Sequence, residues 1–209
     1  MSGGVPPPPS STLLSFQHLT SAAIAVTLAT SGMVPIQHLA FIPLSFFYTL
    51  FLSKTAFPTL STTPPPPIFA AHLLLLTAYV SVGAVVGLVL PVAYIVHGVL
   101  NGDTEGVKPA APHLFLLACQ VVMEGVTFAG GFSLPVWVFV PVAYNAVRMY
   151  AVFDWVKSEV VKGGGRWLSL ANLVFWGFNL FGFLLPVYMP KAFKKYYDYD
   201  DDDVKDKDT

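Results

Sequence analysis

The stretch His113–Trp155 decides the fold, and it reads HLFLLACQVVMEGVTFAGGFSLPVWVFVPVAYNAVRMYAVFDW. It contains two apolar segments, about His113–Gly131 and Val136–Trp155, joined by the turn signal GGFSLP. Because about 20 apolar residues in a helix span the ~30 Å hydrocarbon core of a bilayer, the stretch predicts a hairpin of two membrane-spanning helices. Glu124 and Arg148 are charged residues well inside these two segments.

The charged residues of the rest of the chain lie at the edges of apolar runs, between them, or in the C-terminal tail. Only 11% of the 209 residues are charged, against about 25% in a typical soluble domain, and the first 53 residues carry no charged side chain. A charge at mid-membrane costs roughly 2.5–3.5 kcal/mol on insertion scales, so this segregation predicts one integral membrane domain. The formal net charge of −1 gives no long-range attraction to nucleic acid.

Four further apolar segments extend the pattern of the hairpin. They run about Leu13–Gly32, His38–Ser53, Phe69–Leu100 and Trp167–Tyr188. The segment Phe69–Leu100 would be ~48 Å long as a helix and contains Pro91, so we expect one tilted helix kinked at that proline. The fold class we predict is all-α, an integral membrane bundle of about six transmembrane helices. Whether residues 13–53 form two spans or a re-entrant hairpin stays open.

The composition shifts along the chain suggest three parts. Residues 1–12 are Pro-rich and predicted to be disordered, residues 13–190 form the membrane domain, and residues 191–209 form a basic and then acidic disordered tail. An irregular linker is expected at Ala56–Pro67, because its prolines cannot lie inside a helix. The N-terminus has neither a basic n-region nor the arginines of a transit peptide. We therefore expect an endomembrane or the plasma membrane rather than a plastid.

The two helices of the hairpin each carry a pair of polar residues on one face. Gln120 and Glu124 are four apart, whereas Asn145 and Arg148 are three apart. Counting back from the turn places Gln120 level with Arg148, and Glu124 level with Tyr144 and Asn145. These five residues are our candidate intramembrane polar site, built around a predicted Glu124–Arg148 pair.

Two interpretations of that pair stay open. An intramembrane charge is by default a candidate site for an ion, a proton or a polar solute, but a neutralising pair also locks a hairpin together. In addition, Arg148 is close enough to the end of its predicted helix to extend toward lipid headgroups.

Other residues predict helix packing rather than chemistry. Gly83 and Gly87 form a G-x-x-x-G pair, a spacing at which another helix can approach closely. Asn172 and Asn179 are seven apart, on one face of the last apolar segment, where they can form hydrogen bonds between helices. The five histidines show no metal-binding spacing, so we expect no metal and no cofactor.

Several strings of the chain resemble a known family. They are LSKTAFP (52–58), YVSVG (79–83), AAPH (110–113), MEGV (123–126), DW (154–155), FNLFGFLLPVY (178–188) and PKAFKKYY (190–197). The chain resembles, over roughly residues 31–197, a plant family of uncharacterised multi-pass transmembrane proteins defined by a domain of unknown function. The resemblance implies a multi-pass membrane protein and supplies no catalytic or binding residues. The Asp-rich end and the short loop before Trp167 depart from the family pattern.

Two functions are compatible with these observations. The first is a non-enzymatic protein that packs against partner membrane helices, or against itself, in assembly or trafficking, and the Gly83/Gly87 face favours it. The alternative is a small-solute or ion transporter in which Glu124 and Arg148 line the path. In both cases the principal partner is the lipid bilayer.

Overall fold

The computed structural model describes residues 16–59, 73–163 and 167–207, and every regular element in this part is helical. In chain order the elements are α1 (Phe16–Thr30), α2 (Ile36–Thr55), α3 (Leu73–Ala84), η2 (Val85–Val89), α4 (Leu90–Leu100), α5 (Thr104–Val107), η3 (Lys108–Ala110), α6 (Ala111–Ala129), α7 (Leu134–Lys162), α8 (Trp167–Phe178), η4 (Asn179–Tyr188) and α9 (Met189–Lys207). η2 and η4 are π-helical and η3 is a 3₁₀-helix. The all-α prediction is confirmed for the described residues.

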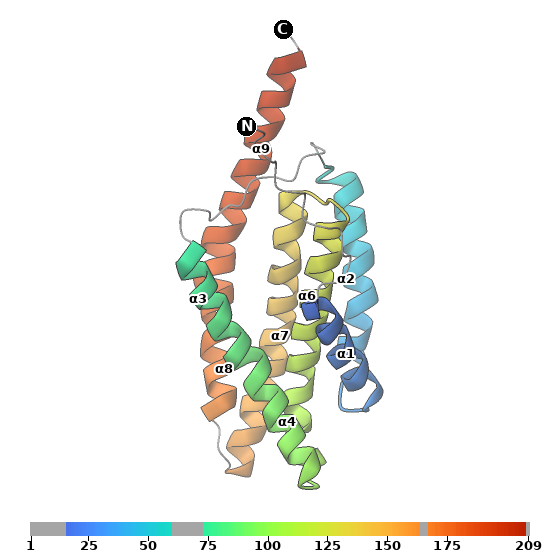
Figure 1. Cartoon of the computed structure of the whole chain (residues 1–209), viewed down its shortest axis with the longest axis vertical. Helices are drawn as coiled ribbons and strands as arrows, with labels where there is room; N and C mark the ends of the chain where they lie inside the picture. Colours follow the sequence, from blue (N-terminus) through green and yellow to red (C-terminus); the bar gives the residue numbers. More distant parts are fainter. Residues whose placement is uncertain (1–15, 60–72, 164–166, 208–209) are drawn as a thin grey trace, which may run out of the picture.

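The α6–α7 hairpin is the centre of the bundle. α6 packs against α1 and α2 as well as α7, while α7 also contacts α8, η4 and α9. Figure 1 shows α2, α6, α7 and the column α8–η4–α9 running roughly parallel, with α3–η2–α4 crossing them obliquely. The turn between α6 and α7 contains Gly131, whose φ of +63° is the left-handed conformation that glycine adopts without strain.

Five of the described helical segments are long and apolar enough to cross a membrane. They are Ile36–Thr55, Leu74–Leu100, Thr104–Ala129, Leu134–Lys162 and Trp167–Asp198. Where we expect about six, the first expected span, Leu13–Gly32, appears as α1, which has 15 described residues. At 1.5 Å per residue α1 is ~22 Å long, shorter than the ~30 Å core of a bilayer. The described part of α1 is therefore a short helix packed along α6.

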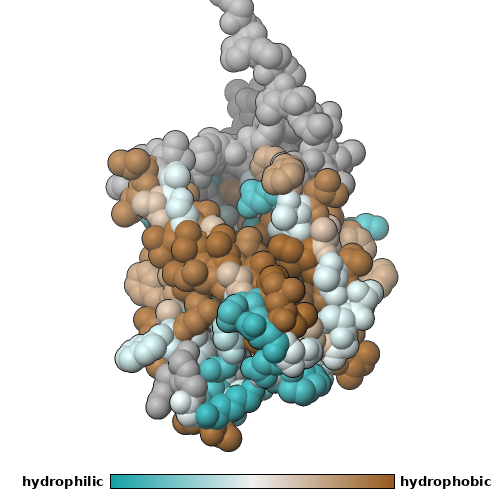
Figure 2. Space-filling model, turned by 60° about the horizontal axis from the view of Figure 1, so that its bottom comes forward, coloured by the Kyte–Doolittle hydropathy of each residue, from teal (hydrophilic) through white to brown (hydrophobic). Residues whose placement is uncertain are grey.

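The outward faces of the helices are apolar, whereas hydrophilic residues gather at one end of the bundle. On α2, Phe47 is 66% exposed, and on α3, Leu74 is 87% exposed. With the bottom of the molecule turned forward, Figure 2 shows the hydrophilic residues gathered at that end and hydrophobic residues around them. This end carries the α4–α6 and α7–α8 connections (Figure 1). Exposed apolar side chains along the helices, next to a polar end, are the surface that lipid contact requires.

The continuous helix α3–η2–α4, called the oblique helix below, changes its hydrogen-bond register just before Pro91. In η2 the backbone N–H of Leu90 donates to the carbonyl of Val85, five residues earlier. Pro91 has no N–H, so neither of the carbonyls four and five residues before it, Gly87 and Val86, receives a bond from this position. Where we expect a kink, the structure has a π-helical turn, and the helix continues without a gap into α4.

Side chains from two other helices form hydrogen bonds with the two carbonyls that receive none from Pro91. Nε2 of His113, at the start of α6, lies 3.1 Å from the carbonyl oxygen of Gly87. The amide nitrogen of Asn172, on α8, donates to the carbonyl of Val86 at 3.0 Å. Because a carbonyl is only an acceptor, Nε2 of His113 must carry the proton. The π turn is thus the point at which α6 and α8 are attached to the oblique helix.

The Gly83/Gly87 face packs against α8 of the same chain. A Cβ added to Gly83 would lie 3.0 Å from the ring of Phe175, and one added to Gly87 would overlap the ring of Trp176. The close approach that the G-x-x-x-G spacing predicts therefore exists, but the aromatic side chains of this chain fill it. This face does not offer itself to a partner helix.

The opposite end of the bundle is tied together by residues after α2, in the hairpin turn and on α9. Ser133 donates to the carbonyl of Phe57 at 2.8 Å, and the hydroxyl of Tyr196 donates to the carbonyl of Pro58 at 3.0 Å. The rings of Phe57 and Phe193 meet edge to face at 5.3 Å. These contacts fix the first turns of α9 against the hairpin.

The chain beyond residue 190 continues as a helix. α9 runs from Met189 to Lys207 without a break after η4 and extends past the other helices (Figure 1), where we expect a disordered tail from residue 191. The expected disordered N-terminus at residues 1–12 and the prolines at 64–67 of the expected linker lie outside the described residues.

Candidate functional site

Arg148 is the deepest charge in the described structure. It lies 14 residues from each end of α7, Leu134 and Lys162, and its side chain is fully buried. Its Nη1 donates to Oε1 of Gln120 at 2.8 Å and its Nη2 to Oδ1 of Asn145 at 3.0 Å. A buried charge is tolerated where hydrogen bonds replace its hydration. Because Arg148 is central and enclosed, the expectation that it extends toward the helix end is wrong.

The guanidinium group also lies on the ring of Trp176, with 3.8 Å between Cζ and the ring centroid. This is a cation–π contact in a water-excluded position, where such contacts are strongest. The indole N–H of Trp176 donates to Oδ1 of Asn172 at 3.1 Å, and the amide of Asn145 donates to the Trp176 carbonyl at 3.1 Å. α7 and α8 are therefore joined through both the side chain and the backbone of Trp176.

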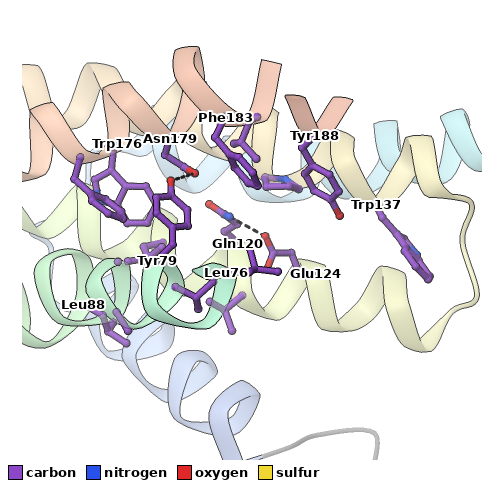
Figure 3. A pocket seen from close by; sticks show the side chains of 18 of the residues that line it. Leu76, Tyr79, Leu88, Gln120, Glu124, Trp137, Trp176, Asn179, Phe183 and Tyr188 are labelled. Atoms are coloured by element: carbon purple, nitrogen blue, oxygen red, sulfur yellow. Dashed lines mark hydrogen bonds between the residues drawn. The ribbon is translucent and has the colours of Figure 1, made fainter. Parts of the chain in front are cut away.

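Gln120 stands between Arg148 and Glu124. Its Oε1 accepts from Arg148, while its Nε2 donates to Oε1 of Glu124 at 2.8 Å (Figure 3). Since a guanidinium has only donors, the amide oxygen must face Arg148 and the amide NH₂ must face the carboxylate. Arg148, Gln120 and Glu124 form a hydrogen-bonded relay, and the arginine sets the direction of both of its hydrogen bonds.

The predicted direct Glu124–Arg148 ion pair is not formed. The ion pairs within 4.0 Å among the described side chains are Lys108–Glu105 and Lys157–Asp154, both exposed. The physical reason is helical register, because Gln120 is level with Arg148 and Glu124 lies one turn farther along α6. The two charges interact through an amide instead of touching.

Glu124 faces a cavity of about 420 Å³ between the oblique helix, the hairpin and the α8–η4 column. Figure 3 shows its carboxyl group in the same space as Tyr79, Phe183 and Tyr188, with Trp137 at one end. The polar side chains that line it are Gln17, Tyr79, Gln120, Glu124, Thr127, Asn179 and Tyr188. Arg148 is not part of the lining, since Gln120 and Trp176 cover it.

One wall of the cavity is aromatic and carries a second hydrogen bond between helices. The hydroxyl of Tyr79 donates to Oδ1 of Asn179 at 2.6 Å. The Tyr79 ring stacks on Phe175 at 5.4 Å and lies 5.5 Å from the ring of Phe183. Pockets of a few hundred Å³ with mostly apolar walls and a few convergent polar groups are typical binding sites for small molecules.

The structure joins four of the five residues of the candidate polar site. Gln120, Glu124, Asn145 and Arg148 form one hydrogen-bonded chain. Tyr144 is outside it, because its side chain points to the other face of α7, where its hydroxyl lies 2.9 Å from the hydroxyl of Ser45. Tyr144 thus attaches α2 to the hairpin.

The predicted packing asparagines have distinct positions. Asn172 is fully buried and bonds to Trp176 and to the π turn. Asn179 bonds to Tyr79 and lines the cavity. Both therefore form the hydrogen bonds between helices that a seven-residue spacing on one face suggests, and Asn179 belongs to the site as well.

Sequence reasoning missed three residues of the site or its support. His113 is fully buried and bonds to the π turn. Trp176 and Tyr79 were not singled out. The available signal was Pro91, because a proline within an apolar helix requires donors from elsewhere, and the i, i+4 spacing of Asn172 and Trp176. Among the described residues, no group of three or more His, Cys, Asp or Glu could hold a metal.

Among the comparisons with known proteins, only the one with protein-family models gives a match. A family model described as a domain of unknown function, DUF7733, matches residues 14–197. No curated protein and no solved structure matches the chain.

Proposed function

The chain belongs to the DUF7733 family, a domain of unknown function, and we propose that it is a multi-pass membrane protein that carries a small solute through the cavity at Glu124. The role is non-enzymatic. The observation that carries the proposal is the position of Glu124, whose carboxyl group faces the cavity between the oblique helix, the hairpin and the α8–η4 column while Gln120 separates it from its countercharge.

The membrane setting is supported by the length and surface of the helices. Five of them are long and apolar enough to cross a bilayer, and their outward faces are apolar. In such a setting Glu124 and Arg148 are expensive to retain. Ionisable residues that persist inside membrane helices usually mark a path for an ion, a proton or a substrate.

The alternative role for the two charges is a lock that holds the hairpin together. A lock is strongest when carboxylate and guanidinium form two direct, parallel hydrogen bonds. Here the neutral amides of Gln120 and Asn145 accept from Nη1 and Nη2 of the guanidinium, and Glu124 points into the cavity. This arrangement separates the structural work, done by Gln120 and Asn145, from the group that a solute would meet.

The assembly role loses the observation that favoured it. Gly83 and Gly87 are covered by Phe175 and Trp176 of the same chain, so their small size is already explained by internal packing. The apolar outer faces of the helices are explained by lipid contact alone. Transport therefore stands ahead of assembly.

The accessibility of the cavity to water provides a test that needs no knowledge of the solute. Val121 lines the cavity beside Glu124, so Val121→Cys in a Cys119→Ala background reports on it without altering the relay. In sealed proteoliposomes we expect a membrane-impermeant thiol reagent to label this cysteine from either side, because a carrier opens alternately. If the cysteine is not labelled from either side, the transport proposal fails and the role of the two charges is to hold the hairpin together.

Two control variants calibrate the labelling. Glu105, whose side chain is 84% exposed at the polar end, should react as Glu105→Cys from one side only. Phe47 lies on the outward face of α2 and is 66% exposed, so Phe47→Cys should stay unlabelled in lipid. Labelling of Phe47→Cys would show that the bundle is not embedded as proposed.

A further inference from the structure

We infer that the solute of the Glu124 cavity is neutral and polyhydroxylated, of the size and chemistry of a monosaccharide or a cyclic polyol. This inference rests on the proposed function. It comes from three features of the cavity taken together, namely its charge balance, its hydrogen-bonding groups and its aromatic wall.

Charge balance excludes most ionic solutes. Glu124 is the only carboxylate in the described lining, and the described lining contains no Lys or Arg. Behind it lies the fully buried guanidinium of Arg148, a group that carries a positive charge in proteins. With Glu124 ionised, its carboxylate and the guanidinium joined to it through Gln120 sum to zero, and a solute cation or anion would leave one uncompensated charge in a low-dielectric site.

The direct contacts of the solute point the same way. An anion would meet the carboxylate of Glu124, because the guanidinium of Arg148 is covered by Gln120 and Trp176. A cation would gain the carboxylate but would face the field of Arg148 one residue behind it. A neutral hydrogen-bond donor is attracted to Glu124 without either penalty.

The lining offers donors and acceptors at separated points. Glu124 accepts one hydrogen bond from Gln120 through Oε1, and a carboxylate has about four acceptor positions. Asn179 accepts from Tyr79 through Oδ1, which turns its amide NH₂ group away from that bond as a donor. The hydroxyl of Thr127, which donates to the backbone carbonyl of Glu124 at 3.0 Å, adds an acceptor to the lining. Acceptors and donors spread around one cavity match a solute with several hydroxyl groups.

The aromatic wall supplies flat apolar surface. Tyr79, Phe175 and Phe183 form one continuous group of rings, and Trp176 meets Phe175 edge to face at 5.0 Å. The electron-rich face of an aromatic ring attracts weakly positive C–H groups. A saturated ring with hydroxyls around its edge and C–H groups on its faces therefore uses both parts of the lining at once. The volume of about 420 Å³ lies within the range of small-molecule sites.

A matched trio of sugars tests the inference on the full chain in lipid nanodiscs. D-glucose, D-glucosamine and D-glucuronate share one ring and differ in charge, the second being cationic at pH 6. Binding is followed by intrinsic fluorescence, because Trp137 and Trp176 line the cavity. We expect glucose to bind at least tenfold more tightly than either charged analogue. Equal or tighter binding of a charged analogue, or binding of none of the three, overturns the inference.

A charge-changing variant gives a readout that a structural role would not produce. Glu124→Gln keeps the shape and hydrogen bonding of the lining but leaves the positive charge of Arg148 uncompensated. In this variant we expect the ratio of the binding affinity for glucuronate to that for glucose to rise at least tenfold. The matched control Glu105→Gln lies at the exposed polar end and should leave the preference unchanged. An unchanged preference in Glu124→Gln contradicts the charge-balance argument.

Uptake into proteoliposomes separates this inference from the proposed function. If glucose binds in nanodiscs but is not taken up, transport fails and the solute class stands. If the vesicles accumulate glucosamine or glucuronate in preference to glucose, transport stands and the neutral class is overturned.

Discussion

The side-chain oxygen of Gln120 lies 2.8 Å from Nη1 of Arg148, and this contact organises the polar interior of the bundle. It turns the Gln120 amide nitrogen toward Glu124 and so holds the carboxyl group at the cavity. A neutral residue, and not the acid, is therefore the immediate partner of the buried cation. The predictions below follow from that division of roles.

The first prediction concerns Gln120 itself. Gln120→Leu leaves Nη1 of Arg148 without an acceptor in a fully buried position, and a buried charged donor left unpaired costs about 3 kcal/mol. We expect a clear drop in the thermal unfolding temperature in detergent micelles, measured by intrinsic fluorescence. Val121→Leu, at the next position of the lining, adds volume without touching a polar group and should cost much less. Equal losses would show that Gln120 acts only by packing.

The second prediction exchanges the two residues of the relay. In the double variant Gln120→Glu with Glu124→Gln, the carboxylate moves next to Arg148, where a direct charge-assisted pair is about twice as strong as a neutral hydrogen bond. We expect thermal stability equal to or above that of the parent chain. The cavity loses its carboxylate, so solute uptake into proteoliposomes should fall at least tenfold.

The double variant alone distinguishes a structural role of the two charges from a role of Glu124 in transport. A lock would work as well or better after the exchange, so uptake that survives alongside raised stability would remove Glu124 from the transport path. Each single variant serves as a control. Gln120→Glu alone places two carboxylates one turn apart and should be less stable than the exchange, since like charges at this spacing repel.

The part of this arrangement that the sequence predicts is the part set by regular helix geometry. Counting from the turn near Ser133 places Gln120 about level with Arg148, because both helices advance 1.5 Å per residue. The same count cannot tell which of Gln120 and Glu124 reaches the guanidinium, since a side chain spans the offset of one turn and its rotamer decides the contact. Hydropathy likewise predicts α2 and α7.

Contacts between residues that lie far apart in the sequence are the second feature that the sequence does not predict. The Gly83/Gly87 spacing predicts a close approach, but nothing local shows that Trp176 of the same chain fills it. Pro91 predicts two carbonyls without donors, yet the donors His113 and Asn172 come from different helices. Such contacts depend on how the helices are arranged around one another, and residue spacing within one segment carries no information about that.

The third prediction compares the two glycines of the oblique helix. A methyl group at Gly87 overlaps the Trp176 ring, which is held by its bond to Asn172 and by Arg148 on its face. Overpacking of this kind typically costs 1–3 kcal/mol, so we expect Gly87→Ala to lower the unfolding temperature markedly. Gly83→Ala meets only the outer edge of the half-buried Phe175 ring at 3.0 Å. It should be the milder variant, and the reverse order would contradict the fixed position of Trp176.

The fourth prediction concerns the π turn and uses a double-mutant cycle. His113→Phe keeps a ring beside Trp155, at 6.0 Å in the native structure, but removes the donor to Gly87. Leaving a buried carbonyl unpaired costs about 1–3 kcal/mol. Pro91→Ala restores a backbone N–H that can serve the same carbonyl, so His113→Phe should cost less than half as much in that background. Thermal unfolding of the four proteins gives the coupling.

The sign of that coupling decides what His113 does. A stabilising coupling between Pro91→Ala and His113→Phe means that the imidazole replaces the hydrogen bond that proline cannot make. Additive losses would mean that His113 contributes only its ring, because the cost would then be independent of the backbone donor. His97, exposed at the polar end, provides the control, since His97→Phe should show no coupling to Pro91→Ala. If the coupling holds, the π turn of the oblique helix is maintained by a side chain at the start of α6.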